Sequence, residues 1–387
     1  MPRGRSHDDC CRIRAALEPE RAVIVPQSGA TGDLLTRLRE IRRRGNVPLV
    51  GDDRWPAALW ETVRDTARRV EPAPDIAWAT LTSGSSGSPR IVLRTAASWG
   101  DSFAAVARYL EAGAGDAVLL PAPPAASLTL FSLAHALEAG PRPLFAADPH
   151  SRSHATSLHG TPQALRAVLD SGAGSRLRAA LVGGSHLDPA LRHRAEAAGI
   201  RVTAYYGAAE LSFVAVDEGD GLRAFPGVEL SVRNGELWVR SPFTAAGYAG
   251  ATSPLRRDGE WATVGDRAEL VDGRLRLLRR ADDAILSASA TIVPEEVEAV
   301  LRSVPGVRDA IVFGLPHPTV GALVAAFVEL DDDLALELRR AARERLAPAH
   351  RPRRWFAGEL PRTASGKPAR AEAARRALAG EVPRLAI

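Results

Sequence analysis

The sequence predicts an α/β protein with one large N-terminal domain, residues 1–282, and one small α+β C-terminal domain, residues 283–387. Strand-like and helix-like segments alternate over residues 22–153, which favours a mostly parallel sheet covered by helices. The pattern changes after residue 282, and the remaining stretch has the size of an ordinary domain. A chain of 387 residues, 45% of them hydrophobic, is long enough to bury a core.

The expected elements follow in chain order. Residues 22–25 form a short strand, 33–44 a helix and 47–50 a possible strand, which Pro48 limits to a sheet edge or a loop. Residues 76–79 and 91–93 are strands on either side of a Gly/Ser-rich run. Residues 96–111 form a helix, and 117–120, 179–182 and 202–205 form strands. In the small domain we expect helices at 294–303, 334–346 and 369–378 and a strand at 323–330.

Composition excludes several classes of protein. The net charge is +4 and the pI is near 9.5, but 46 acidic residues are interspersed with the basic ones, which argues against nucleic acid as a partner. No apolar stretch reaches the roughly 20 residues of a membrane span. The N-terminus has no apolar run typical of a secretory signal. The two cysteines, Cys10 and Cys11, are adjacent, which favours reduced thiols and a cytoplasmic location.

One lysine stands apart from every other basic residue. The chain has 50 basic residues, and all except Lys367 are arginine. Lysine delivers a compact charge through three freely rotating donors, whereas the arginine fork is broad and planar. Lys367 follows Ser365 and Gly366 in a turn that can project it. A chance lysine on a solvated loop is the simpler interpretation, but a second stretch upstream favours a functional one.

That second stretch is residues 80–90, where hydroxyl side chains and glycines follow a buried strand. Such a run can direct backbone N–H and side-chain O–H groups at one anion. The alternative is a flexible linker, but the run is short and lies between strands. A Walker loop is excluded because Gly84 and Gly87 are too close together and no Gly-Lys-Ser/Thr follows.

Residues 82–90 resemble the phosphate loop of the acyl-adenylate-forming (AMP-binding) enzyme superfamily. Further motifs follow in the family's order. Residues 206–210 are similar to its Tyr-Gly-x-Thr-Glu element, 235–239 with 247–248 to the next strand pair, and 261–266 to its Thr-Gly-Asp turn. Residues 280–283 are similar to the hinge, and 361–367 to the lysine loop. The phosphate loop lies closer to the N-terminus than in typical family members. In this respect the chain resembles compact o-succinylbenzoate-CoA ligases and other small acyl-CoA synthetases.

The resemblance implies a large domain of layered sheets and helices with a small β-barrel-like part, and a mobile C-terminal lid. It also implies functional residues. Lys367 is catalytic, Glu210 holds Mg²⁺, Asp282 is the hinge, and Ser185, Ala208 and Phe213 line the acyl pocket. Tyr206 beside Gly207 lets a ring stack on a base at close backbone approach. Contacts to ATP and AMP are expected from Thr82, Ser83, Gly84, Ser85, Ser86, Gly87, Arg90, Gly184, Ser185, Tyr206, Gly207, Ala208, Asp266 and Arg280.

The implied activity is ATP-dependent conversion of a carboxylic acid into an acyl-adenylate, with release of pyrophosphate, followed by transfer to the thiol of CoA. Mg²⁺, the donors of the Gly/Ser run and Lys367 would neutralise the charge that develops on the phosphates.

Three departures from the family pattern keep alternatives open. Ala209 replaces a Thr or Ser, Pro124 occupies the place of an acyl gate, and Ala288-Ser289 replaces a glycine pair. One alternative is a stand-alone adenylating enzyme that loads the phosphopantetheine of an acyl carrier protein or passes the adenylate to an amine. Another is a degenerate, non-catalytic nucleotide-binding module.

Overall fold

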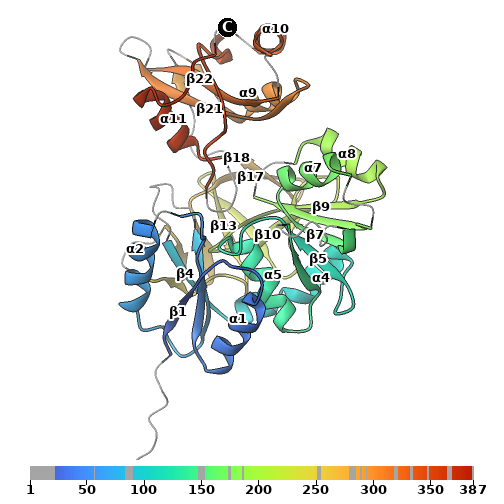
Figure 1. The fold of residues 1–387 in the computed structure, drawn as a ribbon, viewed down its shortest axis with the longest axis vertical. Helices are drawn as coiled ribbons and strands as arrows, with labels where there is room; N and C mark the ends of the chain where they lie inside the picture. The colour runs from blue at the N-terminus through green and yellow to red at the C-terminus, as the bar shows by residue number, and fades with distance from the viewer. Residues whose placement is uncertain are drawn as a thin grey trace, which may run out of the picture.

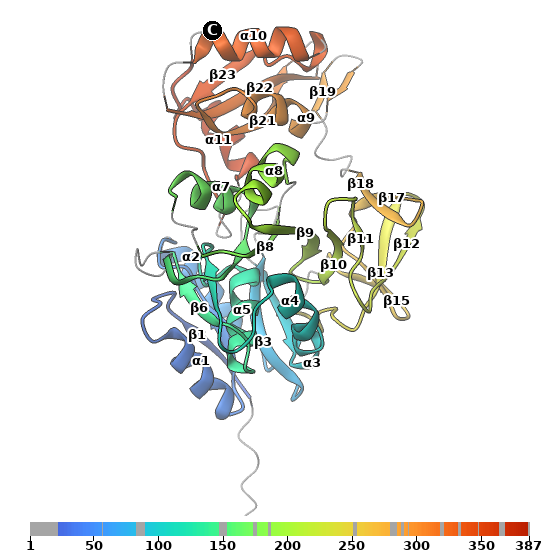
Figure 2. The same cartoon turned by 90° about the vertical axis from the view of Figure 1, so that its right-hand side faces the viewer.

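A computed structural model shows a large domain, β1 to β18, with a small domain, β19 to α11, stacked on one end (Figures 1 and 2). The residues that the structure describes are 22–55, 57–82, 90–146, 153–172, 176–184, 187–250, 254–278, 285–287, 290–292, 294–317, 321–331, 334–346, 348–363 and 368–385.

The first sheet has the order β1-β2-β3-β4-β14. Strands β1, β2 and β3 are parallel, and β4 is antiparallel to both of its neighbours. Parallel strands need a crossover, and here helices α1 and α2 provide it. The elements are β1 (Ile24–Gln27), α1 (Leu34–Arg43), β2 (Val47–Val50), α2 (Ala57–Arg68), β3 (Ile76–Thr82), β4 (Arg90–Thr95) and β14 (Gly247–Tyr248).

Strand β2 lies inside this sheet, so the expectation that Pro48 confines it to an edge or a loop was wrong. All four of its residues are buried. The backbone N–H groups of Val47 and Gly51 donate to carbonyls of the β1 segment. Because alternate residues of a parallel strand bond to the same neighbour, the missing N–H of Pro48 faces away from β1. The β1–β2 ladder therefore forms without it.

The second sheet has the order β11-β10-β9-β8-β7-β5-β6, and its strands from β9 to β6 are all parallel. The predicted mostly parallel arrangement is therefore divided between two sheets. The elements are α4 (Phe103–Leu110), β5 (Ala117–Leu120), α5 (Ser127–Leu137), β6 (Arg142–Phe145), β7 (Ser157–Gly160), α7 (Pro162–Asp170), β8 (Ala179–Gly183), α8 (Pro189–Ala197), β9 (Arg201–Ala208), β10 (Ser212–Asp217) and β11 (Arg223–Ala224).

Helix α5 joins the two sheets. Its residues from Thr129 to His135 are all buried, and a helix buried on every side belongs between layers. It contacts β3 of the first sheet and β6 and β7 of the second. Helix α5 thereby packs the first sheet against the second.

The predicted helix at 96–111 is broken into α3 (Ala97–Gly100) and α4. The Ser102 hydroxyl donates to the carbonyl of Trp99 at 2.7 Å, and the chain starts a new helix at once. The break leaves Trp99 in the core, with its ring centroid 5.7 Å from that of Phe131.

A third sheet completes the large domain beside β10 and β11 (Figure 2). Its main path is β15-β16-β13-β17-β18, and β12 pairs with β13. The two strands expected as a pair do not pair with each other, because β13 belongs here and β14 to the first sheet. The strands are β12 (Glu229–Arg233), β13 (Glu236–Arg240), β15 (Arg256–Asp258), β16 (Trp261–Thr263), β17 (Arg267–Val271) and β18 (Arg274–Leu278).

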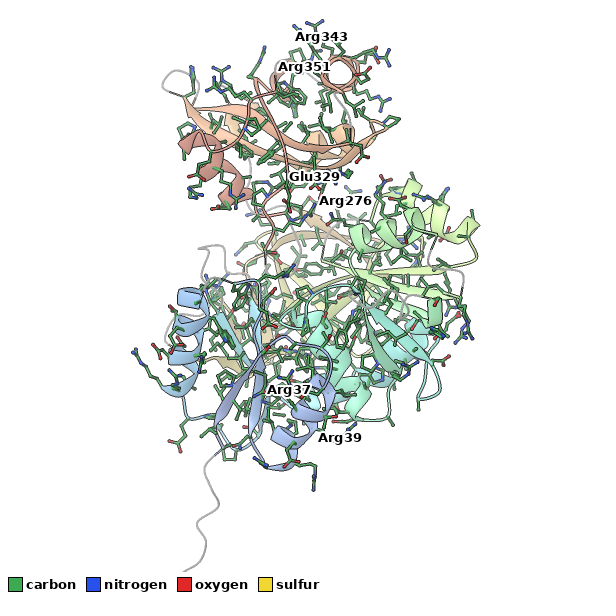
Figure 3. All side chains as sticks on the ribbon, viewed as in Figure 1. Arg37, Arg39, Arg276, Glu329, Arg343 and Arg351 are labelled. Atoms are coloured by element: carbon green, nitrogen blue, oxygen red, sulfur yellow. The ribbon has the colours of Figure 1, made fainter. Side chains whose placement is uncertain are left out.

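The small domain is a sheet of order β20-β19-β22-β21, with β23 beside β22, covered by helices. The predicted helices at 294–303, 334–346 and 369–378 and the strand at 323–330 are confirmed as α9, α10, α11 and β22. Figure 3 shows Arg343 and Arg351 at the end far from the large domain. The elements are β19 (Ile285–Ser287), β20 (Ala290–Ile292), α9 (Pro294–Arg302), β21 (Val307–His317), β22 (Gly321–Leu330), α10 (Ala335–Arg345), the 3₁₀ helix η3 (Pro348–His350), β23 (Arg354–Ala357) and α11 (Arg370–Ala379).

Within the described part of the chain, no helix has both the length and the apolar character needed to cross a bilayer.

Candidate active site

The Gly/Ser-rich run begins and ends at paired strand residues. Thr82, the last residue of β3, lies opposite Arg90, the first residue of β4. The hydroxyl oxygen of Thr82 is buried and has no hydrogen-bond partner among the residues that the structure describes. Thr82 therefore brings a bonding group to the base of the run. The run's own candidates lie outside the described residues: Ser83, Gly84, Ser85, Ser86 and Gly87.

Gly207 and Ala208 end β9, where the chain turns back into β10. A β-carbon on Gly207 would lie 2.1 Å from the carbonyl oxygen of Ser212, so only glycine fits this hairpin. The sequence analysis explained this glycine by the approach of a ligand. The structure shows that the close approach of β10 by itself requires glycine at this position.

Tyr206 contacts the third sheet. Its hydroxyl donates to Oδ2 of Asp266 at 2.5 Å, and both side chains are partly buried. Asp266 lies between β16 and β17, so this bond joins the end of β9 to a turn sixty residues later in the chain. The structure thus brings together two residues that the sequence analysis assigned to one site.

Glu210 follows two residues after the end of β9, and its exposed fraction is 8%. Its Oε1 accepts a hydrogen bond from the hydroxyl of Tyr248, on β14. Burial, and next the carboxylate of Glu210, raise the pKa of Tyr248, so the phenol stays protonated and remains a donor. The carboxylate is therefore held from the edge strand of the first sheet.

Arg94 is fully buried and was missed by the sequence analysis. Its Nη1 donates to the carbonyl of Ala209 at 3.0 Å and its Nη2 to that of Phe243. Burial lowers the pKa of Arg94 to about 9, while the charge of Glu210 acts in the opposite direction. Arg94 fixes the backbone beside Glu210 and supplies a buried positive charge. An arginine that directly follows the buried run Ile91–Leu93 of β4 is the signal that could have revealed it.

At the end of β8, Gly183 is in close contact with Tyr205. A β-carbon on Gly183 would lie 2.3 Å from Cζ of that ring. Gly184 follows with φ of +89°. Phe213 is 3% exposed and its ring centroid lies 4.7 Å from that of Tyr205, so Phe213 packs in the core behind Tyr205. Tyr205 is the aromatic side chain next to Gly183, and Ser185 lies outside the described residues.

A buried polar chain runs from Tyr205 into the core. Nε2 of His159 lies 3.1 Å from the Tyr205 hydroxyl, and Nδ1 lies 2.7 Å from the hydroxyl of Ser132. Burial, and next the nearby His135, lower the pKa of His159 to about 3. His159 is therefore neutral near pH 7.

Pro124, in the place of the family's acyl gate, is buried. Ala126, two residues later, forms a bridge with Leu81 near the end of β3. The segment that carries Pro124 is thus joined to the strand that leads into the run.

A magnesium ion fits Glu210 only if phosphate oxygens or waters complete its shell. Within the described residues, no group of three or more His, Cys, Asp or Glu side chains could hold a metal ion. Mg²⁺ is usually held by one or two carboxylates together with substrate phosphates and waters, so one carboxylate suits it. The remaining candidates, Arg280, Asp282, Ala288, Ser289 and Lys367, lie outside the described residues.

Comparison with known proteins gives two family matches and several relatives. The AMP-binding enzyme family matches residues 16–249, and the AMP-binding enzyme C-terminal domain matches residues 296–367. A probable 2-succinylbenzoate–CoA ligase of Mycobacterium tuberculosis is 31% identical over 335 residues, covering 81% of this chain and 85% of the relative. The 2-succinylbenzoate–CoA ligase of Escherichia coli K12 is 30% identical over 292 residues, covering 71% of this chain and 63% of the relative. This match therefore spans less than two thirds of the Escherichia coli protein.

Solved structures share the fold. The structure of Escherichia coli MenE with bound OSB-AMS has a TM-score of 0.78 at 24% identity, covering 92% of this chain and 88% of that one. Bacillus subtilis MenE in complex with AMP has a TM-score of 0.70 at 22% identity, covering 91% and 88%. The predicted fold class, a large α/β domain followed by a small α+β domain, is confirmed.

Proposed function

This chain belongs to the AMP-binding enzyme family, and we propose that it is an acid–thiol ligase. It would join a carboxylic acid to the AMP part of ATP with release of pyrophosphate, and then transfer the acyl group to the thiol of CoA. One observation carries this proposal. The Tyr206–Asp266 and Glu210–Tyr248 hydrogen bonds bring a candidate ribose acceptor and a candidate metal ligand to the same end of β9.

The nucleotide would lie along the carboxyl ends of β8 and β9. The two oxygens of Asp266 suit the two hydroxyls of a ribose, and the bond from Tyr206 orients the carboxylate. Thr82 and Arg90, with the run between them, would bind the phosphates. Gly184 would lie beside the adenine, as would Gly207 and Ala208.

Glu210 would hold Mg²⁺ against the phosphates, and a bound Mg²⁺ would neutralise the charge that develops on their oxygens. Tyr248 holds this carboxylate by a hydrogen bond, and Arg94 fixes the neighbouring backbone through the carbonyl of Ala209, before any ligand binds. Ala209 lacks the hydroxyl that the family has at this position. One neutral hydrogen bond contributes about 0.5–1.5 kcal/mol, so its loss slows the reaction without abolishing it.

Lys367 would supply the mobile positive charge at the α-phosphate, and Asp282 would be the pivot that brings it in, with Arg280 at the ribose. We place the domain boundary between residues 282 and 283. Buried apolar side chains from Ile285 onward form clusters of their own, which supports this division.

The acid would lie beside Gly184, with Ser185 and Ala208 around it. The ring of Tyr205, which lies against Gly183, would face the acid, and Phe213 would support this ring from the core. The names of the relatives make 2-succinylbenzoate the first acid to test.

An acyl carrier protein is the second candidate acceptor. A fatty acid–[acyl-carrier-protein] ligase of Mycobacterium marinum, MmaC, is 34% identical over 151 residues, covering 38% of this chain and 28% of the relative. Helix α10 also exposes Arg339, Arg340 and Arg343, for which the structure records no carboxylate partner among the described residues. These charges suit an acidic carrier.

The test is acid-dependent exchange of labelled pyrophosphate into ATP, with a panel of aryl and aliphatic acids that includes 2-succinylbenzoate. We expect at least one acid to support exchange and Lys367→Ala to lower its rate about 100-fold, as removal of one electrostatic stabiliser does. The exposed Arg39→Ala is the control. Lack of exchange across the panel would favour a non-catalytic module, and normal exchange in Lys367→Ala would refute the role of that lysine.

The acceptor is identified with the same acid by following AMP release in the presence of CoA, a phosphopantetheinylated carrier protein or an amine. Release with CoA supports the ligase, and release with the carrier protein alone supports the second candidate.

A further inference from the structure

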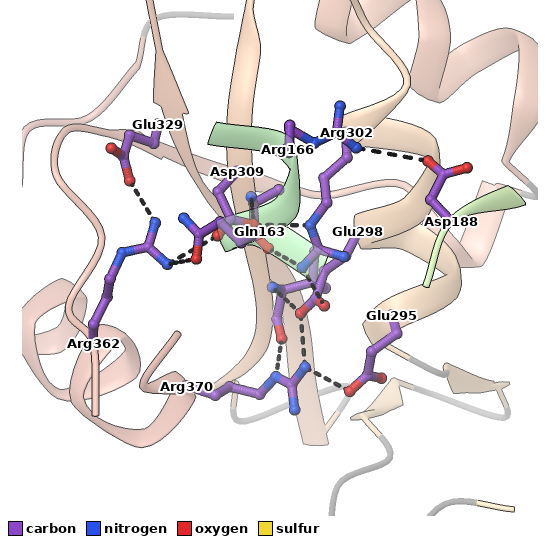
Figure 4. Close-up of polar contacts among 12 residues, drawn as sticks. Gln163, Arg166, Asp188, Glu295, Glu298, Arg302, Asp309, Glu329, Arg362 and Arg370 are labelled. Atoms are coloured by element: carbon purple, nitrogen blue, oxygen red, sulfur yellow. Dashed lines mark hydrogen bonds and ion pairs between the residues drawn. The ribbon is translucent and has the colours of Figure 1, made fainter. Parts of the chain in front are cut away.

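The two domains are joined by a hydrogen bond between Arg362 and Gln163. Nη1 of Arg362, in the small domain, lies 2.8 Å from Oε1 of Gln163, on helix α7 of the large domain (Figure 4). Helix α7 starts at a defined residue because Pro162 is its first residue and the Thr161 hydroxyl accepts from the N–H of Ala164. The position of Gln163 is therefore set by the helix start.

The guanidinium of Arg362 is oriented within its own domain. It donates to Oδ2 of Asp309 at 3.1 Å and to Oε2 of Glu329 at 3.0 Å. These two carboxylates are 8% and 12% exposed. Arg302 donates to the other oxygen of Asp309 at 2.8 Å and holds that carboxylate in place. Arg362 thus presents a fixed donor to the large domain.

Arg362 lies at the base of the turn that contains Lys367. It forms an antiparallel bridge with Pro368, and the N–H of Ala369 donates to the carbonyl of Pro361 at 2.7 Å. On the far side of the turn, Arg370 forms ion pairs with two carboxylates of α9, Glu295 and Glu298, each at 2.7 Å (Figure 4). Both ends of the turn are therefore attached to the body of the small domain. Arg362, Pro368 and Arg370, which flank Lys367 in the chain, must therefore move with that domain.

Through Gln163, the base of the lysine turn lies near the carboxyl ends of the parallel strands of the second sheet, where the candidate site is. Helix α7 directly follows the carboxyl end of β7. Strands β7, β8 and β9 are parallel, so their carboxyl ends, with Gly184 and Tyr206, lie along one edge. The Arg362–Gln163 contact holds the base of the lysine turn at this edge.

We propose that the Arg362–Gln163 contact sets the orientation of the small domain used to form the acyl-adenylate, which makes Gln163 a positioning residue for that half-reaction. The inference rests on the proposed function. Gln163 is neutral and accepts through one oxygen, so water can replace Arg362 when the small domain reorients. A carboxylate at this position would form an ion pair with Arg362, and such a pair is harder to separate.

The test uses Gln163→Ala, Gln163→Glu and the matched control Arg166→Ala. Arg166 lies one turn along α7, and its recorded ion pair is with Asp188 of the same domain, at 3.9 Å. Arg362→Ala is avoided because it would also remove a hydrogen-bond donor from the largely buried carboxylates of Asp309 and Glu329. Two reactions are measured with the full chain and the acid that gives the fastest wild-type pyrophosphate exchange. One is the exchange itself, and the other is thioester formation from CoA and separately supplied acyl-adenylate.

We expect Gln163→Ala to lower kcat for exchange about tenfold, the effect of losing one hydrogen bond to a charged group, while KM for ATP stays within about twofold. Thioester formation from the supplied adenylate should be unchanged. Gln163→Glu should retain exchange and slow thioester formation, and added salt should relieve that slowing. Arg166→Ala should match the wild type in both reactions.

An equal effect of Gln163→Ala on both reactions, or no effect on exchange, would overturn the inference while the proposed function stands. Lack of exchange in the wild type with every acid would count against the proposed function itself, and the inference would fall with it. Equal urea midpoints for the variants and the wild type show that any change comes from docking rather than from unfolding.

Discussion

The hydroxyl of Tyr248 donates a hydrogen bond to Oε1 of Glu210, 38 positions earlier in the chain. Tyr248 lies on the edge strand of the first sheet, and Glu210 follows the last parallel strand of the second. The candidate metal ligand is therefore held at the junction of the two sheets, and the geometry of Glu210 depends on both.

Tyr248→Phe removes the donor and keeps the ring. We expect the Mg²⁺ concentration for half-maximal pyrophosphate exchange to rise about 5- to 10-fold, as loss of one hydrogen bond to a charged group implies. Saturating Mg²⁺ should restore the rate. The control is Tyr109→Phe, on α4. An unchanged Mg²⁺ dependence would show that Tyr248 does not orient Glu210.

Arg94→Met leaves the carbonyls of Ala209 and Phe243 without their buried donor. We expect the free energy of unfolding, measured with urea, to fall by about 2–4 kcal/mol, since each unsatisfied buried group costs about 1–3 kcal/mol. Arg39→Met, at an exposed position of α1, should change it by less than about 0.5 kcal/mol. If both variants unfold at the same urea concentration, the hydrogen bonds of Arg94 to Ala209 and Phe243 do not stabilise the fold.

Gly207→Ala forces the β9–β10 hairpin apart, because the new methyl group would lie 2.1 Å from the Ser212 carbonyl oxygen. We expect the free energy of unfolding to fall by about 2–3 kcal/mol and pyrophosphate exchange to be lost. Gly113→Ala has no atom within 4 Å of its methyl group and serves as the control. Wild-type stability in Gly207→Ala would contradict the close contact.

Stability should depend on pH through His159. An unfolded histidine titrates near pH 6.5, whereas burial lowers the pKa of His159 to about 3. Between these values the unfolded chain binds the proton and the folded chain does not. The free energy of unfolding therefore falls as pH decreases through this window, by up to about 1.4 kcal/mol per pH unit for one histidine.

Urea unfolding at pH 7, 6, 5 and 4 measures this dependence. His159→Gln should show a shallower decrease than the wild type, and the exposed His193→Gln should show the wild-type decrease. Equal slopes for all three proteins would rule out a buried neutral His159.

Segments with a strong local pattern were predictable from the sequence. The strand expected at 117–120 is β5, and the strand expected at 323–330 is most of β22. The spacing of the family motifs predicted the fold, because those motifs lie at fixed places in it. Tyr206 and Asp266, assigned to one site from motifs alone, share a hydrogen bond.

Partners from distant segments were not predictable. Hydrophobic periodicity reports that a strand is buried but not which segment covers it, so the contacts of Arg94 with Ala209 and Phe243 left only a weak signal in the sequence. For the same reason, the sequence did not predict that Phe213 packs in the core against Tyr205. A strand's two faces look alike in sequence when both are covered.

The pairing of β14 with β4 also has a consequence for biosynthesis. Translation proceeds from the N-terminus, so β4 emerges from the ribosome long before Gly247 and Tyr248, which pair with Leu93 and Val92. During that interval β4 has an open edge, the kind of surface that promotes misassembly of nascent chains. When β14 pairs with β4, it covers this edge and also brings Tyr248 to Glu210. A nascent chain that ends before residue 247 therefore has an open β4 edge and a Glu210 without this donor.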